Sequence, residues 1–266
     1  MREHGKDGIR WLAFQALGRA EGVVHAVSAR HGGVSPPPYH TLNLGLGSGD
    51  TPERVRANQA ILARALGLDT ERLTRQRQVH GADVAVIRRA ADFPPGGFLG
   101  DYDALVTDVP GVALVVRVAD CVPVLLYDPA RRAAGAVHAG WRGTVAGAVR
   151  AAVRAMEEAF GTRPGDLLAG VGPAIGPCCY EVDTPVIQAV RRTFGEAAAD
   201  LLRPVDAAHA HLDLWEANRR LLLAAGIPAE RIEVAGLCTA CRTDLFYSHR
   251  REGPATGRFA GVIALR

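Results

Sequence analysis

The chain has 266 residues, a length that can bury a substantial core in one large domain or two small ones. Its formal net charge is only +3 and no run of basic residues stands out, which argues against nucleic acid and membrane surfaces as partners. No apolar run approaches the ~18 residues of a membrane span, and the first 17 residues carry scattered charges instead of a signal-peptide stretch. We therefore expect a cytoplasmic protein, present as a monomer or a weak homodimer.

The first part of the chain predicts a strand, a long loop and a helix. Residues 23–30 alternate between apolar and polar positions, as in a half-buried strand. Residues 31–50 are rich in Gly, Pro and Ser and predict a loop. A helix is expected after Thr51, which suits the N-cap, with Pro52 in its first turn and Gly67 beyond its last turn.

The central part predicts extended structure and then one strong helix. Residues 77–87 are expected to be extended with a break at a glycine, and residues 111–128 hold two apolar runs with strand character. Residues 133–138 predict another short strand. A helix is expected to begin near Thr144 and to end before Gly161, because its apolar residues recur with a period of 3.6. Those apolar positions are Val145, Val149, Val153, Met156 and Phe160.

Strands and helices alternate irregularly in the last part of the chain. The expected elements are a strand over 167–171, a helix from Thr184, a helix over 213–225, and strands over 232–237 and 259–265. Strand pairs are more frequent than strict βαβ units. We therefore predict an α+β, or mixed α/β, fold in which one domain spanning residues 1–266 contains mixed β-sheets flanked by helices.

The strongest chemical motif is V-H-A-G-W-R-G-T at residues 137–144. His138 ends a predicted strand, the glycines allow a ligand to approach the backbone closely, and a helix follows. A helix N-terminus attracts anions, and Arg142 adds a planar donor suited to phosphate or carboxylate. The alternative interpretation is an ordinary strand–turn–helix corner with a surface arginine.

Two further segments contain residue types that bind metals. Asp120 and Cys121 lie between two apolar strands, and His80 stands beside a glycine in extended structure. Taken singly, a buried cysteine is usually structural, and a lone histidine is usually a polar residue with a satisfied hydrogen bond. Together with His138, however, they supply two histidines and one cysteine on separate extended segments, the composition of a catalytic zinc site with an open fourth position.

The same motifs carry a family resemblance. The chain resembles the YfiH-like family over nearly its whole length, in segments at 28–45, 78–84, 103–107, 119–128, 137–144, 172–182 and 238–258. The A-D-C and H-A-G-W-R-G segments are highly specific for that family. The resemblance implies a fold shared with cysteine-dependent toxin deamidases. It also implies a zinc ion bound by His80, Cys121 and His138, a ligand set that accepts copper as well.

The resemblance further implies an activity. Members of the family are described as cleaving purine nucleosides such as adenosine, inosine and methylthioadenosine by phosphorolysis, and as deaminating adenosine. Older descriptions call them multicopper polyphenol oxidases, or laccases, and a bacterial link to peptidoglycan editing is also described. The expected partners of this chain are therefore purine nucleosides and phosphate.

Phosphorolysis needs a phosphate site beside the ribose. Arg142 is the main candidate, and Arg30 and Arg251 are weaker ones taken from the resembling segments. Asn43 and Ser35 are candidate contacts to ribose or phosphate.

Deamination needs a carboxylate that shuttles protons. Asp120 and Glu181 are the candidates, beside Cys121 and His138 as catalytic groups. Asp120 alternatively orients a histidine ligand from behind the metal site.

Three other functions remain open from the sequence. A hydrolase or amidase acting in peptidoglycan editing would use Cys121 as nucleophile and His138 as base. A copper polyphenol oxidase is less favoured, because the chain has nine histidines and one H-x-H pair, His209 and His211, expected in a solvated loop. A binding or cell-wall regulatory protein is the non-enzymatic alternative, and it predicts no nucleoside turnover.

The remaining cysteines receive no role from the sequence. Cys178 and Cys179 are adjacent and are predicted to be reduced thiols. Cys238 and Cys241 form a C-x-x-C pair, but no two further ligands for a zinc knuckle lie near them in the sequence. The basic run at residues 249–251 either caps the site or forms a solvated edge.

Overall fold

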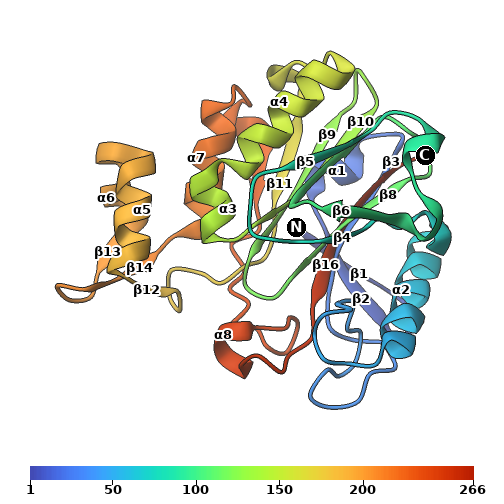
Figure 1. Cartoon of the computed structure of the whole chain (residues 1–266), viewed down its shortest axis with the longest axis horizontal. Coiled ribbons are helices and arrows are strands. Elements are labelled where there is room, and N and C mark those ends of the chain that lie inside the picture. The colour runs from blue at the N-terminus through green and yellow to red at the C-terminus, as the bar shows by residue number, and fades with distance from the viewer.

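Two β-sheets pack face to face, and helices cover their outer faces (Figure 1). The computed structural model describes residues 1–266, with the side chain of Pro95 set aside. The first sheet has five antiparallel strands in the order β1 (Arg2–Lys6), β2 (Ile9–Ala13), β3 (Val23–Ser28), β16 (Phe259–Leu265) and β8 (Ala113–Val118). The last strand of the chain therefore lies between β3 and β8.

The second sheet has six strands and mixed directions. Its order is β15 (Ile232–Val234), β11 (Leu168–Val171), β9 (Val122–Asp128), β10 (Ala133–Ala139), β7 (Ala104–Thr107) and β5 (Val84–Ile87). The two outermost pairs are parallel and the inner pairs are antiparallel. A parallel two-stranded ribbon, β4 (Arg75–Arg77) with β6 (Phe98–Asp101), forms a separate sheet, and hydrogen bonds from the β4 segment attach it to β8.

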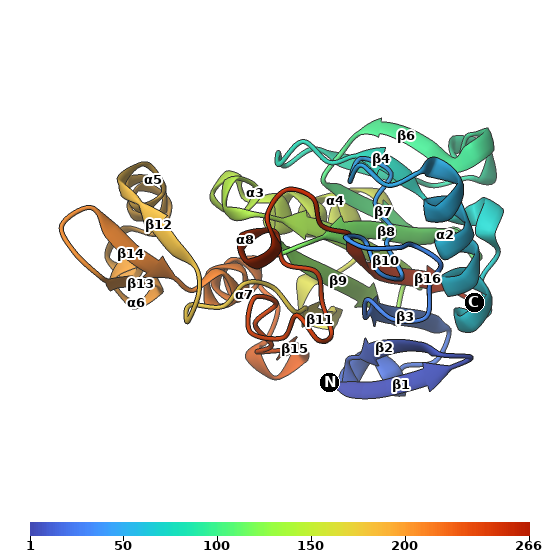
Figure 2. The same ribbon diagram turned by 90° about the horizontal axis from the view of Figure 1, so that it is seen from below.

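Helices cover the two outer faces of this sandwich (Figure 2). Helix α2 (Pro52–Leu66) packs on the five-stranded sheet through Leu62 and Leu66. Helices α3 (Trp141–Ala146), α4 (Ala148–Phe160) and α7 (Leu214–Ala224) pack on the six-stranded sheet. Two shorter helices, α1 (Gln15–Arg19) and α8 (His249–Glu252), lie in connections.

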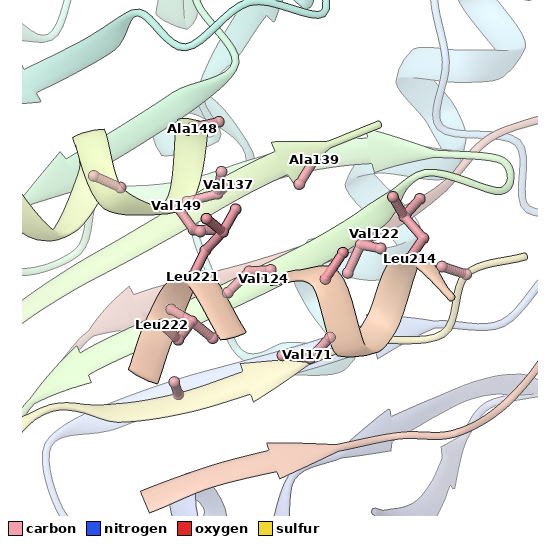
Figure 3. Close-up of a cluster of buried hydrophobic side chains, with 14 of the residues drawn as sticks. Val122, Val124, Val137, Ala139, Ala148, Val149, Val171, Leu214, Leu221 and Leu222 are labelled. Carbon is pink, nitrogen blue, oxygen red and sulfur yellow. The ribbon is translucent and has the colours of Figure 1, made fainter. Parts of the chain in front are cut away.

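Strand β9 is buried along its whole length because both of its faces are covered. Its even-numbered residues, such as Val122 and Val124, pack against the helices, whereas Leu125 and Tyr127 pack against the other sheet. Figure 3 shows Leu221 of α7 extending toward Val137 and Val149, in the same cluster as Val124. Burial on two sides explains why the sequence shows continuous apolar runs here instead of alternation.

A small unit projects from one end of the molecule in both views (Figures 1 and 2). It contains β12 (Glu181–Asp183), β14 (His209–Leu212) and β13 (Leu202–Pro204), with α5 (Thr184–Phe194) and α6 (Ala198–Leu201). Its buried side chains, including Val190 and Leu212, join the same hydrophobic cluster as α4 and α7. The predicted solvated loop at His209 and His211 is therefore wrong, since both residues lie in β14.

The prediction of mixed sheets flanked by helices is confirmed, and the local differences concern boundaries and short elements that were not predicted. The helix expected near Thr144 begins at Trp141, and Gly147 splits it into α3 and α4 because its φ of 82° is left-handed. The extended segment expected over 77–87 is interrupted by a loop between β4 and β5. Within the described part of the chain, none of the helices combines the length and apolar character that a membrane crossing requires.

Candidate active site: a His–Cys–His cluster in an arginine-lined cavity

His80, Cys121 and His138 come together from three separate segments. One side-chain atom of each lies within 4.8 Å of the corresponding atoms of the other two. His138 is near the end of β10, and Cys121 directly precedes β9. Because β9 and β10 pair with Val122 opposite Ala139, Cys121 and His138 lie at the same edge of the sheet. His80 reaches them from the loop between β4 and β5.

Gly140 lets the cluster form. A Cβ atom on Gly140 would lie 2.8 Å from Sγ of Cys121 and 2.9 Å from Nδ1 of His80. Separations below 3.0 Å are not found for real Cβ atoms, so any other residue would push these ligand atoms away. The H-A-G segment therefore requires glycine at this position because no side chain fits beside Cys121 and His80.

Asp103, which directly precedes β7, organises two of the three residues from behind. Its Oδ1 lies 2.7 Å from Nδ1 of His138 and also accepts the backbone N–H of His80 at 3.0 Å. Its Oδ2 accepts the N–H groups of Val79 and Gly81. These bonds hold His80 in a left-handed conformation with φ of 61° and leave Nε2 of His138 free to face the cluster.

Cys121 and His138 each favour the charged form of the other. Burial raises the pKa of the Cys121 thiol, but the neighbouring His138 and His80 outweigh it and lower the pKa to about 6. Burial lowers the pKa of His138, but Cys121 and Asp103 outweigh it and raise the pKa to about 9. Without a metal, the pair is therefore a thiolate and an imidazolium near neutral pH.

The donor set fits a zinc ion. Two imidazoles and one thiolate are typical zinc ligands, and single-ion bonds of about 2.0–2.3 Å require donors as close as these. The contact between Asp103 and His138 is the carboxylate–histidine arrangement that commonly supports metal ligands. Three protein ligands leave one position for substrate or water.

The cluster lines a cavity of about 740 Å³ whose walls are strongly basic. Six arginines contribute to it: Arg75, Arg77, Arg117, Arg142, Arg250 and Arg258. Among the lining residues that the structure describes, Asp120 is the only carboxylate. Aromatic rings of Phe98, Trp141 and Tyr180 complete the wall. Such a cavity attracts a ligand that joins an anionic group to a flat ring.

Two of these arginines differ in how they are held. Arg142 is exposed, and its guanidinium lies 4.3 Å above the ring centre of Trp141. Arg117 is half-buried and donates to the carbonyl oxygens of Leu44 and Thr74. Burial, with a smaller contribution from Arg75, lowers the pKa of Arg117 to about 10. Arg117 therefore forms a fixed part of the wall, whereas Arg142 is free to meet a ligand.

Asp120 lines the cavity, but it forms no hydrogen bond with the histidines of the cluster. Its Oδ1 accepts the hydroxyl of Thr239 at 2.5 Å, and its Oδ2 accepts the backbone N–H of Arg250 at 2.7 Å. The expectation that Asp120 orients a histidine ligand is wrong, because Asp103 holds that position.

Two other predicted residues lie outside the cavity. Glu181 is exposed on β12, and its carboxylate lies 3.9 Å from Nε2 of His211, so its predicted role as proton shuttle is not supported. Arg251 is an exposed residue of α8, whereas its neighbours His249 and Arg250 line the cavity.

Three more predicted contacts are structural. Arg30 is buried, pairs with Glu252 at 2.7 Å and donates to backbone carbonyls, so it is not a phosphate ligand in this arrangement. Asn43 and Ser35 are buried and both bind the carboxylate of Asp50. They shape the N-terminal loop, whose residues 45–48 reach the cavity in their place.

Sequence reasoning missed Asp103 and most of the arginines. Asp103 directly precedes a buried strand, and Arg117 interrupts an apolar run, so both are charges at positions that the fold buries. A buried charge requires a partner or a function, and that signal was available in the sequence. Arg258 and Arg75 gave no comparable signal, because long connections bring them to the cavity.

Comparisons with known proteins find relatives that match nearly the whole chain. The family model for multi-copper polyphenol oxidoreductase laccase matches residues 24–266. A purine nucleoside phosphorylase of Bacteroides thetaiotaomicron is 37% identical over 96% of this chain and 96% of its own length. The purine nucleoside phosphorylase YlmD of Geobacillus stearothermophilus is 39% identical over 92% of this chain and 91% of its own.

Solved structures show the same fold. The crystal structure of YlmD from Geobacillus stearothermophilus superposes with a TM-score of 0.92 at 36% identity, covering 99% of this chain and 98% of that one. The Bacillus licheniformis hypothetical protein YfiH superposes with a TM-score of 0.90 at 35% identity, covering 98% and 97%.

Proposed function

The chain belongs to the multi-copper polyphenol oxidoreductase laccase family, also called YfiH-like, and we propose that it is a zinc-dependent purine nucleoside enzyme. Its reactions are phosphorolysis of adenosine, inosine and methylthioadenosine, and deamination of adenosine. The observation that carries the proposal is the His–Cys–His cluster inside a cavity lined by six arginines and three aromatic rings. The names of the relatives, purine nucleoside phosphorylases, support the same substrate class.

Phosphorolysis replaces one bond at the ribose by another. An oxygen of phosphate forms a bond to C1′ while the bond from C1′ to the purine nitrogen breaks. The electron pair of the broken bond leaves with the purine, which takes up a proton. Arg142 and the other arginines of the wall bind and orient the phosphate, and the aromatic rings contact the base.

His80, Cys121 and His138 would hold the zinc ion, which would supply Lewis acidity for an oxygen or a water at neutral pH. Asp103 keeps the proton of His138 on Nδ1, so that Nε2 presents a lone pair to the cluster. In deamination, water adds to C6 of adenosine and ammonia leaves. Asp120 is the carboxylate positioned in the cavity to move the protons, oriented by Thr239 and Arg250.

A second candidate function has its own observation in favour. Asp103, His138 and Cys121 form a series in which the pKa of the thiol is lowered by His138 and the pKa of His138 is raised by Cys121 and Asp103. That order is typical of a Cys–His–Asp hydrolase, and it supports a cysteine hydrolase or amidase as the alternative. Peptidoglycan is the substrate that the family resemblance implies for it. The same Sγ atom cannot be both a permanent metal ligand and a free nucleophile.

A copper polyphenol oxidase has less support. Among the described residues, the groups able to hold a metal are the His–Cys–His cluster and one set of cysteines. The single H-x-H pair lies on β14, where His209 contacts Asp206 and His211 contacts the carbonyl of Pro177. Neither histidine lines the cavity.

One experiment separates these functions. Zinc-loaded protein is incubated with adenosine, with and without phosphate, and the products are identified. Adenine with ribose 1-phosphate, formed only with phosphate, indicates phosphorolysis, and inosine with ammonia indicates deamination. If neither product forms, the nucleoside proposal fails, and release of peptide from a peptidoglycan fragment then tests the amidase.

A further inference from the structure

Four cysteines gather at a second place in the molecule, outside the arginine-lined cavity. The Sγ atoms of Cys178, Cys179, Cys238 and Cys241 all lie within 4.8 Å of one another. Sequence spacing does not predict this cluster, since Cys178 and Cys241 are 63 positions apart. The two further ligands that the C-x-x-C pair lacked come from a distant turn.

The pairing of two strands brings the cysteines together. Strands β11 and β15 are parallel neighbours, and the chain beyond each of them continues side by side. Ala174 forms a parallel bridge with Cys238, and its carbonyl accepts the N–H of Thr239 at 3.1 Å. The carbonyl of Gly176 then accepts the N–H of Cys179 at 2.9 Å, which folds the Cys178–Cys179 turn back toward the second loop.

The sulfur positions match a single small ion. Sγ of Cys241 lies 3.6 Å from Sγ of Cys178 and 3.4 Å from Sγ of Cys179. Four thiolates at ~2.3 Å from one tetrahedral zinc lie ~3.8 Å from each other. Sγ of Cys238 also accepts the backbone N–H of Gly176 at 3.3 Å, a contact that favours the thiolate form.

We propose that Cys178, Cys179, Cys238 and Cys241 form a closed tetrathiolate site for one thiophilic divalent cation, with zinc preferred. Thiolates select such ions over magnesium and calcium. An iron–sulfur cluster places several ions between the thiolates and needs them farther apart than they are here. Four protein ligands leave no open position, so this site is structural and differs in kind from the His–Cys–His cluster.

The site is accessible yet anchored. Cys238 is buried against Ile175 and Trp215, whereas Cys178 and Cys241 are exposed. The ion can therefore enter after the chain has folded, because two of its ligands lie at the surface.

The site is connected to the wall of the cavity. Thr239, next to Cys238, donates to the carboxylate of Asp120, and Ile175 donates its N–H to the carbonyl of Asp120 at 2.9 Å. One loop on each side of the tetrathiolate site thus contacts the same cavity residue. The ion ties the two loops together and fixes Asp120 beside Cys121.

Metal content of the full chain, purified with reductant and loaded with zinc, tests the proposal. We expect two zinc ions per chain in the wild type. The double variant Cys178→Ser/Cys241→Ser and the double variant His80→Ala/Cys121→Ala are each expected to retain one. These variants control for each other, because each removes one site and leaves the other intact.

The nature of the remaining site is then read with cobalt. In His80→Ala/Cys121→Ala, Co²⁺ should give the intense sulfur-to-metal absorption and tetrahedral bands of four thiolates, and zinc should protect four thiols from a thiol reagent. If that variant binds no cobalt, or gives a spectrum without thiolate bands, the proposal is overturned. A Cys179–Cys241 disulfide found by mass spectrometry in the reduced, metal-loaded protein would also overturn it. This readout does not need the double-serine variant to fold.

Discussion

Oδ1 of Asp103 lies 2.7 Å from Nδ1 of His138, while the same carboxylate accepts three backbone N–H groups from residues 79–81. One buried side chain therefore orients one proposed metal ligand and holds the loop that carries another. We expect Asp103→Asn to lower zinc affinity at the cluster about 10–100-fold. Titration against a competing chelator measures the zinc affinity. Asp108→Asn, at an exposed position of the same segment, is the matched control. Unchanged affinity in Asp103→Asn would refute this role.

Gly140 allows a second test by steric crowding. In Gly140→Ala, the new methyl would overlap Sγ of Cys121 and Nδ1 of His80. We expect loss of zinc from the cluster and a destabilisation of about 1–3 kcal/mol, measured by metal analysis and thermal unfolding. Gly165→Ala serves as the control, because a Cβ atom there meets no atom within 4 Å. A fully metallated and stable Gly140→Ala protein would contradict the geometry of the cluster.

The charge state of the metal-free cluster predicts proton release. Because the pKa of Cys121 is lowered to about 6 and that of His138 is raised to about 9, the pair holds one proton between these values. Zinc needs the thiolate and a neutral imidazole, so binding displaces that proton. The apparent affinity should then rise about tenfold per pH unit between the two values and level off above the higher one.

Calorimetry in buffers of different ionisation enthalpy measures this release. The Cys178→Ser/Cys241→Ser variant is the suitable protein, because it confines binding to the His–Cys–His cluster. About one proton per zinc is expected at pH 7.5. A binding enthalpy that does not depend on the buffer would show that the metal-free pair carries no displaceable proton.

Arg142 is expected to act on phosphate and not on the metal. Its guanidinium is exposed and rests on Trp141, so its loss leaves the cluster intact. Removing one charge-assisted contact at an exposed position should raise KM for phosphate about tenfold, with zinc content unchanged. Arg154→Ala, an exposed arginine of α4 away from the cavity, provides the comparison. Zinc loss with KM for phosphate unaltered would reverse the assignment.

Metal removal separates the two proposed chemistries. If the cluster works through zinc, a chelator should reduce nucleoside turnover at least about tenfold, and added zinc should restore it. If Cys121 instead acts as the nucleophile of an amidase, hydrolysis of a peptidoglycan fragment should persist or rise after chelation and disappear after alkylation of the thiol. Rates are measured on one protein preparation before chelation, after chelation and after zinc is returned.

The three residues proposed to bind metal could be singled out in the sequence, because each carries a local signal and a motif of the resembling family. His80, Cys121 and His138 stand beside glycines or between apolar runs, where polar groups are unexpected. Arg30, Asn43 and Ser35 lie in equally distinctive segments, yet their side chains bind other residues of the protein. Arg30 pairs with Glu252, and Asn43 and Ser35 donate hydrogen bonds to Asp50. A local pattern does not reveal whether a polar residue meets a ligand or another part of the protein.

The cysteine cluster could not be predicted, because it depends on the pairing of strands that are distant in the sequence. The C-x-x-C pair lacks partners in the sequence, and only the parallel pairing of β11 with β15 places Cys178 and Cys179 beside it. The short strands β1 and β4 contain mostly charged residues and lack an apolar pattern. Strands β9 and β16, in contrast, are apolar apart from Asp128 at the end of β9, and both were located correctly.

The chain crosses from one sheet to the other in the three residues 119–121, between the end of β8 and the start of β9. Asp120 makes this crossing in a left-handed conformation with φ of 86°. The sulfur of Cys121 is thus attached at the seam of the sandwich. Any sliding of one sheet over the other would change the distance from this sulfur to His138, so zinc affinity would report the packing of a core that no substrate touches.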